Sequence, residues 1–346
     1  MKKIVKVKNL LIGSNHIYIQ SMTNTKTKNI EETAKQILSL EEYGCELVRV
    51  AVKDESDALA IKEIIKQIHI PLVADIHFDY RLALLSIESG ASKIRINPGN
   101  MPKEHLKEIV AKCQEYHVPI RIGVNSGSLS EDILDKYGPT SEGLIEEAKR
   151  EIKLLNDLGM DDIIVSLKAT DINTFIDANI KAAKLFPYPL HIGLTEAGPM
   201  LKGSIRSTYA VSKLLDLGIG DTLRVSLTSD PINEIIAAKE ILKIYNKYDG
   251  VEFITCPTCG RCEYNMTEII EKIEPIIDKI NKKLKIAVMG CVVNGIGEGK
   301  EADLGIAGGK DKAVIFSKGK MIKTVEYQDI IDEFNKQLME ITKDVR

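Results

Sequence analysis

The segments KIRINPGN (93–100) and PIRIGVNSGS (119–128) decide the fold of this chain. Each begins as a short strand in which apolar and polar side chains alternate, and each ends in a polar loop that contains glycine. The charged stretch between them carries apolar residues at helical spacing. A strand, a loop and a helix in this order form the repeating unit of a parallel α/β fold.

The same unit recurs as far as residue 231. The other strand-like segments are 17–25, 46–52, 71–78, 162–170, 189–198 and 222–231. Consecutive starts among all eight segments lie 22 to 43 residues apart, which leaves room for one helix after each strand. Eight units predict a closed TIM (β/α)8 barrel. The competing architecture, a doubly wound open sheet, usually has a glycine-rich turn after its first strand, and QSMTNTKTKN contains no glycine.

Helix start and stop signals support this division. Asn29 and Glu32 have the spacing of a capping box, and Gly44 ends the helix that follows. A second helix is expected to begin at residue 140 or 141 and to end at Gly159.

The overall composition is that of an ordinary globular protein. Hydrophobic residues make up 44% and charged residues 28%, and no apolar run approaches the roughly 20 residues of a membrane span. Lys and Arg number 47 against 50 Asp and Glu, so nothing in the net charge of -3 favours nucleic-acid binding. The N-terminus lacks the features of a secretory signal. We expect a cytoplasmic protein with no membrane or nucleic-acid partner.

The character of the chain changes near residue 248. Four of the six cysteines lie between residues 256 and 291, followed by a glycine-dense run and several short strand-like pieces. An amphipathic helix over 329–345 ends the sequence. We expect a barrel domain over residues 1–248 and a smaller α+β domain, built around a bound cofactor, over 249–346.

Polar side chains share one face of the barrel strands, because residues two apart on a strand point the same way. The apolar residues between them take the opposite face, which helices cover. The polar face therefore points into the barrel. It carries the pairs Asp75 and His77, Arg95 and Asn97, Arg121 and Asn125, Ser166 and Lys168, and Arg224 and Ser226.

Five cations from five strands are expected to converge at the barrel mouth. Buried cations need a solvated or ligand-filled site, and Arg binds phosphate oxygens in bidentate fashion. The pattern predicts a phosphorylated substrate, most simply a diphosphate. The alternative is that these side chains form structural ion pairs with Asp75, Glu196 or surface acids. The five are Arg49, Arg95, Arg121, Lys168 and Arg224.

Two further groups lie near strand ends. Glu196 and His191 flank the seventh strand, where each is either a proton-transfer group or a polar neighbour. Gly127 and Ser128 precede a helix that Ser130 is expected to cap, and its N-terminus offers a weak phosphate site.

The motif Cys256-Pro-Thr-Cys259-Gly-Arg-Cys262, with Cys291 farther along, has the spacing of metal ligands. A structural zinc site and an iron–sulfur cluster both use such pairs. Cys291 stands near Glu298 with no second cysteine beside it, which favours a site with one non-cysteine ligand over a zinc ribbon. Cys45 and Cys113 lie in apolar contexts and are expected in the core.

In combination, QSMTNT, DIHF, RINPGN, RIGVNSGS, SLKAT, GLTEAG, RVSLTSDP, CPTCGR and GCVVNGIGE resemble the 4-hydroxy-3-methylbut-2-enyl diphosphate synthases of the non-mevalonate isoprenoid pathway. The motifs occur in the family's order and cover nearly the whole chain. The resemblance implies an oxidoreductase with a TIM barrel and a [4Fe-4S] domain. It also implies reductive ring opening of 2-C-methyl-D-erythritol 2,4-cyclodiphosphate, a flavodoxin or ferredoxin electron donor and a head-to-tail homodimer.

The resemblance also assigns roles to residues of this chain. The cluster ligands it implies are Cys256, Cys259, Cys291 and Glu298. The catalytic residues it implies are Glu298, Glu196, Asp75 and His77. The substrate-binding residues it implies are Arg49, Arg95, Asn97, Arg121, Asn125, Lys168, His191, Arg224 and Ser226.

The chain departs from the family pattern at two positions. Cys262 stands where the family often has another residue, so Cys256, Cys259 and Cys262 form an alternative ligand set. Ile296 replaces the usual Pro before Gly297 in the loop that carries Glu298. Two rival readings remain at this point: a redox-inert barrel lyase or transferase with a structural zinc module of four cysteine ligands, and a non-catalytic regulator that carries a cluster.

Overall fold

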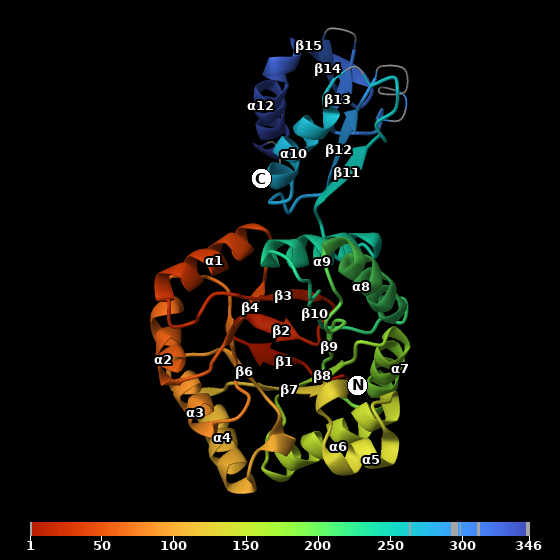
Figure 1. Cartoon of the computed structure of the whole chain (residues 1–346). Helices are drawn as coiled ribbons and strands as arrows, with labels where there is room; N and C mark the ends of the chain where they lie inside the picture. Colours follow the sequence, from red (N-terminus) through yellow and green to blue (C-terminus); the bar gives the residue numbers. More distant parts are fainter. Residues whose placement is uncertain (1, 263, 292–296, 298, 310–311, 344–346) are drawn as a thin grey trace. The chain divides into compact units, whose positions relative to one another are not determined.

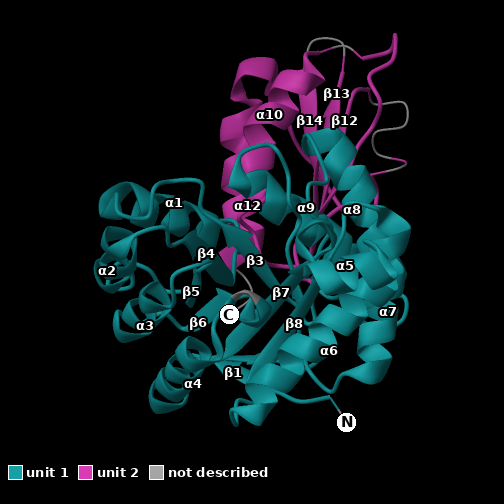
Figure 2. Cartoon of the chain, turned by 60° about the horizontal axis from the view of Figure 1, so that its bottom comes forward, with its two compact units in different colours: residues 1–247 teal, residues 248–346 magenta. Residues whose placement is uncertain are grey.

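The computed structural model describes residues 2–262, 264–291, 297, 299–309 and 312–343. The chain divides into two compact units, Met1–Lys247 and Tyr248–Arg346, which Figure 2 shows in different colours.

Unit 1 is a parallel barrel. Its strands pair in the order β8-β7-β6-β5-β4-β3-β10-β9. A parallel bridge between Val165 and Leu190 joins the two ends of this sheet, so the barrel closes. The predicted TIM barrel is confirmed. The strands are β3 (Tyr18–Met22), β4 (Leu47–Ala51), β5 (Leu72–Asp75), β6 (Lys93–Ile96), β7 (Ile120–Asn125), β8 (Ile163–Lys168), β9 (His191–Ile192) and β10 (Thr222–Leu223).

Helices surround these strands (Figure 1). All of them except the short α5 bury apolar residues, as Ile109 and Cys113 of α4 and Leu144 and Leu155 of α6 illustrate. None of the helices in the described part of the chain has the length and apolarity needed to cross a bilayer. They are α1 (Ile30–Glu42), α2 (Glu55–Ile64), α3 (Tyr80–Glu88), α4 (Lys103–Tyr116), α5 (Glu131–Tyr137), α6 (Ser141–Asp157), α7 (Ile172–Leu185), α8 (Met200–Leu215) and α9 (Pro231–Ile244).

The predicted helix signals hold at three of the four starts and stops, including Gly159, which follows α6 with φ +81. Thr140 caps α6 by accepting a hydrogen bond from the amide of Gly143, and Gly44 follows α1 with φ +99. Asn29 stands at the N-cap of α1 but makes no side-chain cap bond. Its amide donates instead to the Glu32 carboxylate at 3.0 Å. The capping-box prediction is therefore wrong in its bonding, because the two side chains satisfy each other.

A hairpin that the sequence analysis did not anticipate covers one end of the barrel. Strands β1 (Val5–Val7) and β2 (Leu10–Ile12) pair antiparallel. Their buried side chains pack with Leu47, Val73 and Ile164, which lie at or next to the first residues of their strands. The hairpin therefore covers the N-terminal ends of the strands, and the carboxyl ends are left for a site.

In its described residues, unit 2 is a five-stranded sheet with helices α10 and α12 on one face. The strands follow the order β11-β12-β13-β14-β15, with the first three parallel and the last two antiparallel. Buried residues of both helices share one core with the sheet. β11 and α10 were not expected from the sequence. The elements are β11 (Val251–Thr255), α10 (Met266–Ile277), β12 (Leu284–Met289), β13 (Leu304–Gly308), β14 (Lys312–Ser317), β15 (Lys320–Glu326) and α12 (Ile330–Lys343).

The close approach of β9 and β10 yields a stability prediction. Gly193 has φ +151, and a Cβ at this position would lie 2.0 Å from the carbonyl oxygen of Arg224. We expect Gly193→Ala to lower the free energy of unfolding by about 3 kcal/mol or more, measured by urea denaturation. Gly127→Ala is the control, since no atom lies within 4 Å of its Cβ position. An unchanged urea midpoint in Gly193→Ala would contradict this prediction, because it would show that the ends of β9 and β10 can move apart without loss of stability.

Candidate active site

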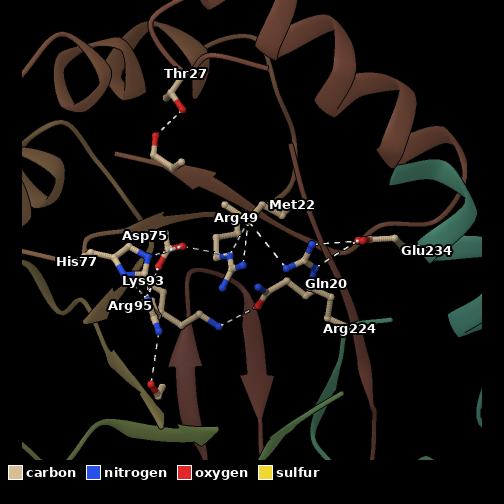
Figure 3. Close-up of polar contacts among 12 residues, drawn as sticks. Gln20, Met22, Thr27, Arg49, Asp75, His77, Lys93, Arg95, Arg224 and Glu234 are labelled. Atoms are coloured by element: carbon tan, nitrogen blue, oxygen red, sulfur yellow. Dashed lines mark hydrogen bonds and ion pairs between the residues drawn. The ribbon is translucent and has the colours of Figure 1, made fainter. Parts of the chain in front are cut away.

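Charged side chains gather inside the barrel near the carboxyl ends of its strands (Figure 3). Arg49 lies on β4, Asp75 ends β5 and Arg95 lies on β6. The side chains of Asp75 and Arg95 are almost fully buried. Alternation along each strand directs them inward, as the sequence predicted.

Asp75 is the common partner of three predicted site residues. Its carboxylate lies 3.1 Å from Arg95 Nη1, 3.7 Å from Arg49 Nε and 3.5 Å from His77 Nε2. Burial alone would raise the pKa of Asp75, but Arg49, His77 and Arg95 outweigh it and hold that pKa well below its usual range. Asp75 is thus a fixed negative charge that orients two arginines.

Arg224 is held by a carboxylate that the sequence analysis missed. Glu234, in the first turn of α9, accepts from Arg224 Nη2 at 3.2 Å and from Ser21 Oγ at 3.0 Å. Arg49, Arg95 and Arg224 therefore form ion pairs, as the alternative expected, and their contacts with a substrate stay a prediction. The acid involved besides Asp75 is Glu234, and Glu196 is exposed with φ +51. The available signal was an acidic residue in the first turn of the helix that begins at Pro231.

Arg121 and Lys168 are buried and form no ion pair with any of the described residues. Arg121 is only 2% exposed, and its Nε and Nη1 atoms have no hydrogen-bond partner in the described part of the chain. Burial, followed by repulsion from neighbouring arginines, lowers the pKa of Arg121 well below its ordinary value. Burial and repulsion from Arg224 and Arg121 do the same to the pKa of Lys168. Both groups are available to a ligand.

Two further buried residues, Lys93 and Gln20, belong to this cluster but were not predicted. Lys93, at the start of β6, is completely buried, and its Nζ lies 3.5 Å from Gln20 Oε1. Burial lowers the pKa of Lys93 well below its ordinary value, and Arg121 and Arg49 add to the effect. The sequence pattern could have predicted Lys93, because residues 93 and 95 are two apart and share one face of the strand.

Neutral polar groups complete the lining. His191 Nδ1 lies 2.7 Å from Thr222 Oγ1, whereas Nε2 is buried with no partner among the residues that the structure describes. Burial and the surrounding cations lower the pKa of His191 well below its ordinary value, so the ring is neutral near pH 7. Asn97 Oδ1 and Ser166 Oγ are also buried and unpartnered. Buried polar atoms without partners indicate places that a ligand fills.

The charges in this lining do not balance. The carboxylates in contact with it are Asp75 and Glu234. The cationic side chains are Arg49, Lys93, Arg95, Arg121, Lys168 and Arg224. An excess of buried positive charge is costly unless an anion neutralises it. The described lining therefore fits a multiply charged anion.

The remaining predicted residues lie at the mouth. Asn125 and Ser226 are half-buried, and His77 is half-exposed beside Asp75. The Ser130 cap prediction is wrong in detail: Ser130 stands at the N-cap of α5 without a cap bond, because its hydroxyl donates to Glu147. Helix α5 has only 7 residues, so its N-terminus is a poor anion site.

A group of free thiols lies in unit 2. Cys256 Sγ accepts the amide N–H of Gly290 at 3.0 Å. A Cβ on Gly290 would lie 3.0 Å from Cys262 Sγ and 3.5 Å from Cys256 Sγ. Both sulfurs therefore lie beside the residue that precedes Cys291, while Cys259 is exposed on the same turn.

These thiols have the chemistry of an iron–sulfur or zinc site. None of the six cysteines is in a disulfide, and soft thiolates suit both kinds of metal centre. Among the residues that the structure describes, no three His, Cys, Asp or Glu side chains come close enough together to hold a metal ion. Glu298 and Ile296 lie outside the described residues. Cys45 and Cys113 are buried in the barrel unit, as expected.

Family models match both units. The model described as GcpE TIM-barrel domain matches residues 2–239, and the one described as GcpE protein C-terminal domain matches residues 252–340.

Curated relatives match over almost their full length. The protein from Clostridium perfringens is 51% identical over 336 residues, which cover 96% of each chain. The protein from Caldicellulosiruptor saccharolyticus is 49% identical over 346 residues, covering 99% of this chain and all of the relative. Both are named 4-hydroxy-3-methylbut-2-en-1-yl diphosphate synthase (flavodoxin).

Among solved structures, dihydropteroate synthase from Yersinia pestis has a TM-score of 0.53 at 11% identity, covering 71% of this chain and 99% of its own. The Stenotrophomonas maltophilia enzyme has a TM-score of 0.53 at 13% identity, covering 71% of this chain and 97% of its own. At such identities the likeness concerns the fold alone.

The unpaired buried cation yields a prediction about anion binding. We expect Arg121→Met to raise the free energy of unfolding by about 1–3 kcal/mol, because a buried charge without a partner is removed. Inorganic pyrophosphate should raise the melting temperature of the wild type and leave that of the variant nearly unchanged. Lys153→Met is the control, since Lys153 is exposed and paired with Asp157. An equal pyrophosphate shift in Arg121→Met would contradict the anion site.

Proposed function

The chain belongs to the GcpE family, and we propose that it is a flavodoxin-dependent 4-hydroxy-3-methylbut-2-en-1-yl diphosphate synthase. In the proposed reaction, 2-C-methyl-D-erythritol 2,4-cyclodiphosphate takes up two electrons and two protons, its ring opens, and one oxygen leaves as water. The product is (E)-4-hydroxy-3-methylbut-2-enyl diphosphate. The observation that carries the proposal is the buried, unneutralised cation cluster of the barrel.

The cyclic diphosphate supplies the anion that this cluster lacks. Arg121 and Lys168 form no ion pair with the described residues, so their charges are free to meet the phosphate oxygens. Arg49 and Arg95 are oriented by Asp75, and Arg224 is oriented by Glu234. Asn97, Asn125, His191 and Ser226 complete the proposed substrate contacts. Opening the ring separates charge onto the diphosphate, and these fixed cations stabilise it in the transition state.

The surroundings of Asp75, His77 and Glu196 decide which of them can transfer a proton. The pKa of Asp75 is held far too low for this carboxyl to donate a proton near pH 7, so its role is to position Arg49 and Arg95. His77 is half-exposed at the mouth and contacts Asp75. Its ring also lies 2.9 Å from Arg95 Nη1. Glu196, exposed after β9, is the proposed proton donor to the departing oxygen.

The thiols of unit 2 are proposed to hold a [4Fe-4S] cluster. The proposed ligands are Cys256, Cys259 and Cys291, with Glu298 completing the set. The gathering of Cys256, Cys262 and the Cys291 segment around Gly290 supports this assignment. When bound, such a cluster supplies electrons one at a time, which a barrel of polar side chains cannot do.

The remaining features of the proposal rest on the family. We propose that residues 1–248 bind the substrate and residues 249–346 carry the cluster, in a cytoplasmic, head-to-tail homodimer. Flavodoxin is the proposed donor, because it is part of the relatives' name.

Anaerobic turnover tests the proposed function. The full chain, purified without air and supplied with reduced flavodoxin, should convert the cyclic diphosphate to the linear product. Arg121→Met should lower kcat/KM at least about 100-fold, because a charged phosphate contact is lost. A colourless protein that contains zinc in place of iron and gives no product would support the redox-inert lyase or transferase instead.

Iron counts in two cysteine variants test the ligand set. We expect Cys291→Ser to prevent stable cluster assembly, because a thiolate ligand is removed. Cys262→Ser should retain the iron content of the wild type. The opposite pattern, with iron lost in Cys262→Ser and kept in Cys291→Ser, would establish the alternative set of Cys256, Cys259 and Cys262.

A further inference from the structure

Helix α6 buries two carboxyl groups one turn apart. Glu147 is 4% exposed and Glu151 is 3% exposed. Buried carboxyl groups normally have a cationic partner. Here no ion pair to either group is found in the described part of the chain, and Glu151 Oε2 has no hydrogen-bond partner at all. Arg150, between them in sequence, bonds Asp132 and Ser130 on the exposed side. Such a pair needs an explanation other than charge pairing.

The two carboxyl groups contact two loops on the catalytic face. Glu147 Oε2 accepts the backbone N–H of Ser130 at 3.0 Å and also its hydroxyl. Glu151 Oε1 accepts the backbone N–H of Gly99 at 3.5 Å. A Cβ on Gly99 would lie 3.3 Å from Glu147 Oε1 and 3.5 Å from Glu151 Oε1, so the loop rests on both groups.

These loops are the continuations of β6 and β7. The first contains the turn Pro98–Asn100, directly after Asn97. The second contains the turn Ser126–Ser128, directly after Asn125. Both asparagines are proposed substrate contacts, and Asn97 Oδ1 is buried without a partner. A shift of either loop would therefore move a proposed substrate contact.

The electrostatics show why the pair can remain buried. Burial and the neighbouring Glu147 raise the pKa of Glu151 to about 8, against the opposing effects of the Gly99 amide, Arg95 and Arg150. Near pH 7 Glu151 is therefore mostly protonated. Arg95 faces it from β6, Arg150 from its own helix, and Asp132 of α5 neutralises Arg150.

We propose that Glu147 and Glu151 are positioning residues that hold the loops after β6 and β7 against α6 and thereby set the affinity for the phosphorylated substrate. The inference rests on the proposed function. Neither carboxyl group is proposed to touch the substrate. Their removal should therefore weaken binding and leave the chemical step largely intact.

Substitutions at Glu151 test this role. We expect Glu151→Ala to raise the Kd for the cyclic diphosphate, measured by calorimetry on the full chain, about tenfold, because a buried hydrogen bond to the Gly99 loop is lost. KM should rise in parallel while kcat stays within about twofold. Glu151→Gln, which keeps the shape of the protonated acid, should bind as the wild type does near pH 7. Glu146→Ala is the matched control, because Glu146 is on the same helix and pairs with Lys149 at its surface.

The pH dependence of substrate affinity tests the positioning role, because a merely structural role of Glu151 would not change it. The folded-state pKa of Glu151 is raised from 4.5 to about 8, so its stabilising effect is complete below 4.5 and is lost as the pH rises through 8. Wild-type affinity should fall between about pH 7 and 9, and Glu151→Gln should lack that component. Equal affinities of Glu151→Ala and wild type, or equal pH slopes of Glu151→Gln and wild type, would overturn the inference.

Arg121→Met separates this failure from failure of the proposed function. If Arg121→Met loses the cyclic diphosphate and Glu151→Ala does not, only the positioning role is wrong. If Arg121→Met also binds normally, the barrel is not the substrate site and the proposed function is overturned with it.

Discussion

Burial of positive charge without a matching negative charge is the constraint on which the barrel depends. Arg121, Lys93 and Lys168 are buried where only Asp75 and Glu234, among the described residues, offset the local charge. Each unpaired buried ion costs several kcal/mol even after relaxation. Burial of the aliphatic residues that face the helices must offset this loss of folding free energy. A bound anion removes the loss by pairing with the buried cations. Stability and ligand binding are thus opposed at the same residues.

The carboxyl groups of the barrel act by orientation. Asp75 and Glu234 each hold arginine side chains at fixed positions, so these donors need little rearrangement when a phosphate arrives. Glu147 and Glu151 extend the same principle to the backbone, because they contact the loops that follow β6 and β7. Such a site is organised before the ligand binds, which lowers the entropic cost of binding.

In unit 2 the candidate functional groups are thiols and not buried charges. Its hydrophobic core lies between one face of the sheet and the helices α10 and α12, and Cys256, directly after β11, and Cys262 pack against that core. The Gly290 amide donates a hydrogen bond to Cys256 Sγ. Cys262 Sγ lies close to Gly290 as Cys256 Sγ does, so unit 2 has one thiol more than the proposed ligand set uses.

Periodicity in the sequence determined the barrel, its eight strand positions and the inward direction of Arg95, Asn97 and Arg121, because side-chain direction on a strand follows from local geometry. The same rule covered Lys93, which was overlooked. Tertiary structure alone decided that Glu234 and not Glu196 binds Arg224, that Asp75 joins two arginines, and that Glu147 supports Ser130. These contacts join residues on different elements, and the distance between such residues is set by how strands and helices pack, which no local pattern encodes.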